Sequence, residues 1–272
     1  MRKERGLDLG TASSGINDSE AVMQLLEIMD VAKSENEVLT DTISKNARLA
    51  IHANDIIFFL NDFYEGIKPE SIHFLAFFTQ LRKSLVLSFL SLLRQHGNQA
   101  QFMMRLAIES ISKAGYALTI KDDKEVAHSH NDGTISEAKD FQKRAYDWIE
   151  SNYPHHSDKL IFFKKMINEH YSHSNIFNAA CDWAPHIGDG EIHSPFFDSE
   201  DPLLMDAALW QLANITLFAI DLIAKAGPES GSVKVKPDFQ EKFNQFVKNH
   251  EELTAQYKQH PRFARHITSS TS

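Results

Sequence analysis

The longest apolar stretch of the chain, residues 203–226, reads LLMDAALWQLANITLFAIDLIAKA. A helix of this length can cross a bilayer. The stretch nevertheless carries Asp206, Asn214 and Asp221, and a charged group in hydrocarbon is costly. The pattern therefore predicts a helix that is buried inside a helical bundle.

A second apolar stretch, residues 72–93, leads to the same prediction. Gln80, Arg82 and Lys83 interrupt its centre, which again disfavours a membrane span. Proline and glycine are few, 8 and 11 in 272 residues, and they separate long segments with helical periodicity. We therefore expect an all-α protein that does not enter a membrane.

The composition is that of a folded, acidic protein. Apolar residues make up 42% and charged residues 24% of the chain, unlike the profile of a disordered protein. The formal net charge of −9 disfavours binding to nucleic acid except through a local basic site, because such binding needs Lys and Arg to neutralise phosphates. Cys181 is the single cysteine, so no intramolecular disulfide can form and a cytoplasmic location is expected.

We expect a single bundle of about eight helices, domain 19–227, followed by a C-terminal amphipathic helix, 237–260. Tails at 1–18 and 261–272 are expected to be disordered. Residues 121–133 and 227–237 are expected to be connectors, and 185–202 an irregular loop or small hairpin. The turn at His96-Gly97-Asn98 should make its flanking helices antiparallel. The predicted helices are 18–33, 36–64, 70–95, 98–119, 134–152, 157–184, 202–227 and 237–259.

The last predicted helix carries an apolar stripe. Phe239, Phe243 and Phe246 begin the stripe, which continues at helical spacing to Leu253 and Tyr257. Such a stripe packs either on the helix's own bundle or on a second subunit, and the sequence leaves both arrangements open.

Two histidines are predicted to point into the bundle. At 100° per residue, His170, His173 and Ser174 share a helix face with Phe163 and Met166, whereas the opposite side holds Lys164, Lys165 and Asn168. A buried histidine needs hydrogen-bond partners, because an unpaired buried polar group costs about 1–3 kcal/mol. Core histidines, a polar pocket and metal ligation all remain open. No partner motif for a metal is visible, so no metal and no cofactor are expected.

Candidate partners for these histidines lie on the predicted helix 98–119. Arg105, Glu109, Ser112 and Tyr116 are spaced by four, three and four residues and form one polar stripe on an otherwise apolar helix. The ordinary alternative is a solvated stripe with a surface ion pair between Arg105 and Glu109, which would contribute less than about 1 kcal/mol.

The same residues carry a resemblance. Arg105-Leu-Ala-Ile-Glu109 followed by Tyr116, and then Phe163, Asn168 and Tyr171-Ser-His173-Ser174 on a later helix, are similar to an uncharacterised bacterial all-helical family. That family distantly resembles the HEPN helical bundles of toxin, defence and RNA-processing proteins. The resemblance covers roughly residues 70–225 and implies a helical fold and a setting in bacterial stress or phage defence.

The catalytic motif of HEPN ribonucleases is not matched. Those enzymes carry Arg and then His with four to six residues between them. Here Lys165-x-x-x-x-His170 is the nearest analogue, and Arg262-x-x-x-His266 is one residue short. The resemblance therefore favours the fold over the ribonuclease chemistry.

Our functional expectation is a helical-bundle protein with an interior polar pocket and an unknown reaction. An anionic group would bind at Arg105, and Glu109 would orient a histidine that carries protons. The alternatives are a non-catalytic interaction or scaffold protein that acts as a homo-oligomer, and a HEPN-like ribonuclease with a degenerate motif. The candidate catalytic residues are His173, Glu109 and His170, and the candidate substrate-binding residues are Arg105, Tyr116 and Ser174.

Overall fold

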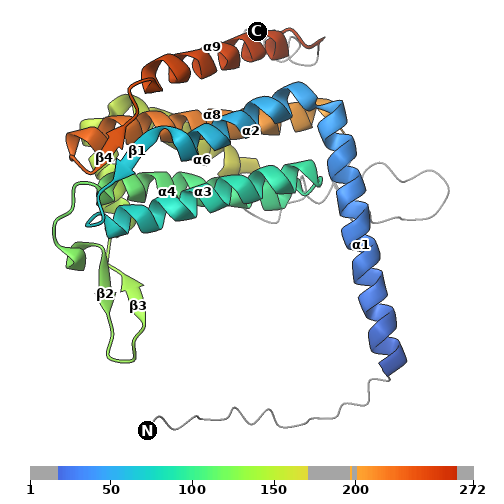
Figure 1. The fold of residues 1–272 in the computed structure, drawn as a ribbon, viewed down its shortest axis with the longest axis horizontal. Helices are drawn as coiled ribbons and strands as arrows, with labels where there is room; N and C mark the ends of the chain where they lie inside the picture. The colour runs from blue at the N-terminus through green and yellow to red at the C-terminus, as the bar shows by residue number, and fades with distance from the viewer. Residues whose placement is uncertain (1–17, 171–196, 198–200, 262–272) are drawn as a thin grey trace.

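The computed structural model describes residues 18–170, 197 and 201–261. Within these ranges eight α-helices carry the fold, and four short strands form two antiparallel two-stranded sheets (Figure 1). The predicted all-α helical bundle is confirmed. The helices are α1 (Asp18–Lys45), α2 (Ala47–Asp62), α3 (Ile72–Leu93), α4 (Gly97–Ala117), α5 (Phe141–Asn152), α6 (Pro154–His170), α8 (Pro202–Glu229) and α9 (Phe239–Lys258).

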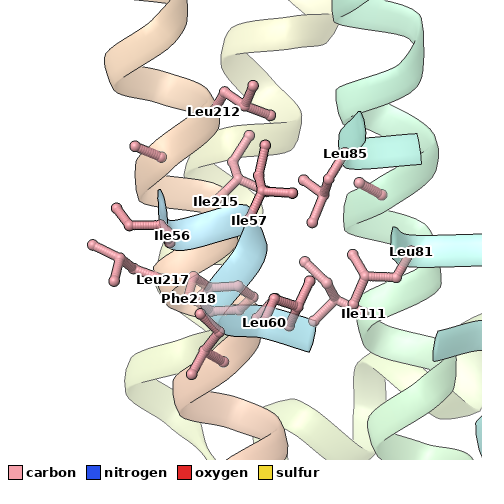
Figure 2. Packing of buried hydrophobic residues seen from close by; sticks show 14 of the residues in the cluster. Ile56, Ile57, Leu60, Leu81, Leu85, Ile111, Leu212, Ile215, Leu217 and Phe218 are labelled. Atoms are coloured by element: carbon pink, nitrogen blue, oxygen red, sulfur yellow. The ribbon is translucent and has the colours of Figure 1, made fainter. Parts of the chain in front are cut away.

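Helix α8 lies at the centre of the core, as its apolar sequence predicts. Its side chains Leu212 and Ile215 have no exposed surface. Figure 2 shows them in one cluster with residues of α2, α3 and α4, among them Ile57, Leu85 and Ile111. Burying a side chain of this size contributes about 1.5–3 kcal/mol. This cluster is therefore a main source of the stability of the bundle.

Helices α3 and α4 form the predicted antiparallel pair. Gln95 adopts a left-handed conformation with φ 58° at the turn, and the Ser88 hydroxyl of α3 donates to the Ala100 carbonyl of α4 at 3.0 Å. Helices α3 and α8 are long and apolar enough to cross a membrane by length and composition. The bundle buries 67% of the apolar window of α8 and 39% of that of α3, so α8 in particular behaves as a core helix. The absence of a membrane span stays a prediction.

The first helix is longer than predicted and projects from the bundle. The predicted break near residue 34 is wrong, because α1 continues to Lys45 and the break before α2 falls at Asn46. Its C-terminal half packs on the bundle, where Gln95 Nε2 donates to the Thr42 hydroxyl at 3.3 Å. Residues 28–33 are exposed on every side, and Figure 1 shows α1 running away from the other helices.

The predicted helix 134–152 begins too early. Strands β2 (Ala127–Ser129) and β3 (Ile135–Glu137) form a hairpin, after a short 3₁₀ turn at Asp123–Glu125. The Asp132 carboxylate accepts from the Thr134 backbone N–H at 2.9 Å, and Gly133 has φ 82°. This is turn chemistry that competes with a helix. The loop or hairpin predicted at 185–202 falls almost wholly outside the described residues.

The expected linker 227–237 is largely ordered structure. Helix α8 continues to Glu229, and strand β4 (Val233–Val235) then pairs with β1 (Tyr64–Ile67), with an irregularity in register between Tyr64 and Gly66. The pairing links the ends of α2 and α8, which are far apart in the sequence. Asp18 already belongs to α1; the remainder of the expected tail 1–18 and residues 262–272 fall outside the described residues.

Helix α9 packs on its own bundle, which answers the question that the sequence left open. The Phe239 ring stacks on Phe59 of α2 with 5.9 Å between ring centroids, and Phe246 lies 5.0 Å from the same ring. The Trp210 indole N–H of α8 donates to the Thr254 hydroxyl of α9 at 2.7 Å. The aromatic stripe therefore covers α2 and α8.

Replacing Gly227 by alanine should lower the free energy of unfolding. A Cβ atom at this position would lie 2.6 Å from Cβ of Val233, so α8 and β4 would have to separate. We expect a loss of about 1–3 kcal/mol, measured by urea unfolding. Gly66→Ala is the matched control, because nothing lies within 4 Å of that added Cβ. Equal losses in both variants would contradict the close contact.

Candidate functional site

The predicted polar stripe of α4 is present and half-buried. The Arg105 Nε atom lies 3.4 Å from Glu109 Oε1, and the two side chains are 36% and 32% exposed. This exposure is intermediate between a solvated surface pair and an interior site. The pair by itself therefore contributes little stability, and its interest lies in what else it contacts.

Arg105 contacts Asn168 of α6, a residue that the sequence analysis placed on the side of the helix away from α4. Arg105 Nη1 donates to Asn168 Oδ1 at 2.7 Å. The prediction that Asn168 and Lys164 point away from this stripe is wrong. Phe163 and Ile167 fill the core, with 2% and 1% exposure. The next residue in each case lies 100° further round the helix, which turns Lys164 and Asn168 towards α4.

Lys164 and Tyr146 complete a group that we call the α4–α5–α6 polar cluster: Arg105, Glu109, Tyr146, Lys164 and Asn168. The Lys164 ammonium lies 4.1 Å from the centroid of the Tyr146 ring, a cation–π contact. Burial and the nearby Glu109 carboxylate raise the pKa of Tyr146 to about 12. Burial lowers the pKa of Lys164, Glu109 opposes that change and Arg105 adds to it. Perturbed groups gathered in this way are typical of functional sites.

The other predicted site residues divide into two groups. Tyr116 lies eleven residues beyond Arg105, about 16 Å along α4, and its ring packs 5.5 Å from Phe141 and 6.2 Å from Trp148. The structure thus does not bring it to the α4–α5–α6 polar cluster. The side chain of His170, and all of His173 and Ser174, lie outside what the structure describes, so their predicted roles stay predictions.

A second polar group lies where α6 meets α8. His156 Nε2 lies 2.9 Å from Asp221 Oδ2, and Lys225 Nζ is 2.8 Å from the same oxygen. Burial acts to raise the pKa of Asp221, but the hydrogen bonds and charges of His156 and Lys225 outweigh it and lower that pKa. His156 is only 8% exposed. The sequence shows Asp221 as a charge within an apolar helix, but it gives no sign that His156 is its partner.

A third group is a stack of rings between α2, α8 and α9. The His250 ring lies 5.4 Å from both His52 and Trp210, nearly parallel to each, and His52 Nε2 is 3.2 Å from His250 Nδ1. Burial, helped by His52, lowers the pKa of His250 to about 4. Burial also lowers the pKa of His52, with Asp55 opposing. The sequence offered no signal for this pairing, because the two histidines are 198 residues apart.

Among the described residues, no group of three or more His, Cys, Asp and Glu side chains has the arrangement of a metal site. Cys181 and His173 fall outside those residues. The expectation of no metal and no cofactor stays a prediction.

Comparisons of the chain with protein-family models, with curated proteins and with solved structures find no match. The resemblance to HEPN bundles therefore stays a prediction, and the binding site proposed below is argued from the geometry of the described residues.

The His52–His250 pair should make stability fall in mild acid. The folded-state pKa of His250 is near 4, below its ordinary 6.5, so the unfolded chain takes up a proton first as the pH falls. The stability due to neutral His250 is therefore complete above pH 6.5 and is lost towards pH 4, on the order of 3 kcal/mol in all. His250→Gln should flatten the dependence of unfolding free energy on pH in that window. If the unfolding free energies of the native protein and the variant changed equally with pH, His250 would not be buried in its neutral form.

Proposed function

We propose that this protein is a ligand-binding helical bundle that holds an anionic group at the α4–α5–α6 polar cluster. The observation that carries the proposal is that Arg105 and Lys164, on different helices, lie near each other and near one carboxylate, Glu109. Among the described residues of the cluster, two positive charges thus face one negative charge. This local excess stands out in a chain whose formal net charge is −9.

The hydrogen-bonding capacity of Arg105 supports the proposal. A guanidinium has five N–H donors and matches phosphate or carboxylate in a two-pronged geometry. In the described contacts, Glu109 lies 3.4 Å from Nε, and Asn168 accepts from Nη1. Asn168 is neutral, so it orients the guanidinium without cancelling its charge. An incoming anion would receive charge-assisted hydrogen bonds from an arginine that is already in position.

The biological setting stays a proposal that depends on the resemblance. A role in bacterial stress or phage defence in the cytoplasm is compatible with a site for a small phosphorylated molecule. If the site is catalytic, His173 would carry the proton and Glu109 would orient it, as the sequence predicts. HEPN-like ribonuclease chemistry is the less favoured version. In the nearest analogue of its motif, a lysine, Lys165, stands where those enzymes have arginine, and His170 stands for the histidine.

Calorimetric titration with inorganic pyrophosphate tests the proposed site. Arg105→Gln and Lys164→Gln should each weaken binding about tenfold or more, because each removes a charge-assisted hydrogen bond. Lys113→Gln is the matched control, since it removes one positive charge from α4 where Lys113 pairs with Glu137 at 2.6 Å, outside the cluster. Circular dichroism shows whether each variant keeps its fold. No binding to the native protein, or equal losses in all three variants, would overturn the proposal.

A second candidate function is that of an interaction protein that forms homo-oligomers through α1. The observation that favours it is the projecting part of α1, where Ile28 and Met29 are 64% and 67% exposed. A lone helix is marginally stable in water without a packed face. Glu35 and Leu39 are half-buried, and Val31, four residues before Glu35, lies on the same face of α1 but is exposed. A second copy of α1 is the partner that we propose for this face.

Sedimentation velocity over a range of protein concentrations tests this second function. The native protein should associate, and the double variant Ile28→Ser/Met29→Ser should shift the equilibrium at least about tenfold towards monomer, because it removes the exposed apolar face. Ile161→Ser/Phe162→Ser is the control, as those α6 side chains are also exposed, 59% and 51%. A native protein that stays monomeric, or a control that dissociates equally, would exclude association through α1.

A further inference from the structure

Helix α9 covers one face of the bundle but is itself thinly buried. Figure 1 shows it lying outside α2 and α8. Three of its 20 residues are buried, Phe239, His250 and Leu253, whereas fourteen of the 28 residues of α8 are buried. An element with few buried contacts opens at a lower free energy than the core of the same protein. The attachment of α9 therefore depends on a small number of contacts, and His250 makes one of them.

The contact at His250 suits neutral rings. His52 of α2 and Trp210 of α8 both stack on the His250 ring, and the two histidines are each 7% exposed. The 3.2 Å between His52 Nε2 and His250 Nδ1 lets one nitrogen donate to the other. His250 Nε2 is buried and has no partner among the described residues. A second proton on this pair would therefore bring a charge and an unsatisfied N–H group into the interface, which is costly.

No carboxylate bonds to either ring in the described part of the chain. Asp55 of α2 acts on His52 through its charge and raises its pKa, but burial outweighs it. Burial and the neighbouring His52 lower the pKa of His250 to about 4. The docked form of α9 is therefore the form in which both rings are neutral, and a proton favours the form in which the pair meets water.

Other charged groups face α9 from each helix beside it. Asp206 of α8 acts on His260, just after α9, and a charged His260 favours the docked helix, so this contact opposes the effect of the buried pair. The remaining groups are Arg48 of α2, which bonds Gln256, and the residues that line the cleft between α6, α8 and α9: His155, His156, Lys159, Asp221, Lys225 and Glu251. His156 and Lys225 both contact Asp221, so their charges are balanced between α6 and α8.

We propose that α9 is an acid-sensitive lid, which detaches from α2 and α8 as a unit when the His52–His250 pair takes up a proton, while the core around α8 stays folded. Residues 236–238, between β4 and α9, are the hinge. Detachment uncovers the Phe59 ring, on which Phe239 and Phe246 pack. It also removes one wall of the cleft, where Phe243 and Val247 of α9 lie opposite Phe218. The lid does not depend on the anion site proposed at Arg105, because it shares no residue with that cluster.

Hydrogen exchange of the full chain at pH 7 and pH 5, each at several urea concentrations below the unfolding transition, tests the lid. A detached helix of this length is marginally stable in water, so its amides exchange once it leaves the bundle. The opening that exposes α9 should depend little on urea, because it exposes little surface, whereas the opening that exposes α8 between Leu209 and Ile223 should depend on it steeply.

Acid should favour the opening of α9 in the same experiment. With a His250 pKa of about 4 in the docked helix and 6.5 after detachment, the equilibrium constant for opening should rise about twentyfold from pH 7 to pH 5. Exchange rates are corrected for the intrinsic effect of pH. If α9 exchanged with the rate and the urea dependence of α8, it would leave only when the whole protein unfolds, and the proposal would be overturned. An opening constant that does not change with pH would overturn it equally.

Variants identify the groups that respond to acid. His52→Phe/His250→Phe keeps two rings in the stack and removes both titrating groups, so α9 should open equally at pH 7 and pH 5. Slow exchange in α8 shows that the variant keeps its core, and His52→Gln/His250→Gln replaces it if the larger rings do not fit. His130→Gln is the control, because this exposed histidine bonds Ser136 in the β2–β3 hairpin, and the rise should persist. A rise that persists in the double variant would assign the acid response to other groups and refute the lid.

Discussion

The burial of α8 is the constraint on which the rest of the structure depends. Helices α2, α3, α4, α6 and α9 all pack around it, and they bury 67% of its apolar window. Because much of α8 is covered, its buried polar residues have to find polar partners, and three of its polar residues find them at seams between helices. Gln211 meets Gln101 of α4, Trp210 meets Thr254 of α9, and Asp221 meets His156 of α6.

The polar groups between the helices follow from the way the outer helices meet this core. On α6, Phe163 and Ile167 fill the core, which fixes the rotation of the helix and turns Lys164 and Asn168 towards Arg105. On α9, Phe239 and Phe246 pack on Phe59 of α2, and the His250 ring stacks on His52 of α2 and Trp210 of α8. The packing of the apolar side chains thus fixes where these polar side chains lie and which partners they meet. Protonation of His250 in mild acid weakens the packing of α9, because the neutral ring joins this helix to α2 and α8.

Much of the fold could be predicted from the sequence because it depends on local periodicity. The apolar segments 72–93 and 203–226 and the turn at His96-Gly97 were predicted close to their observed positions. The hairpin near Asp132 and the strand after Gly227 were missed, since their pairing depends on tertiary contacts or on turn chemistry within a polar segment. For the site, the stripe of Arg105 and Glu109 was found. Its partners were not, because a helical wheel gives the faces of one helix and does not tell how far a neighbouring helix is rotated.

Hydrogen exchange across the whole chain, read at single amides, tests the central role of α8 most directly. If α8 is the centre of the core, its amides between Leu209 and Ile223 should exchange most slowly, at the rate set by global unfolding. The amides of residues 28–33 in α1 should exchange orders of magnitude faster, because no described residue covers that part of the helix. Exchange in α8 as fast as in α1 would contradict the account, since the helix around which the bundle is built would then open independently of it.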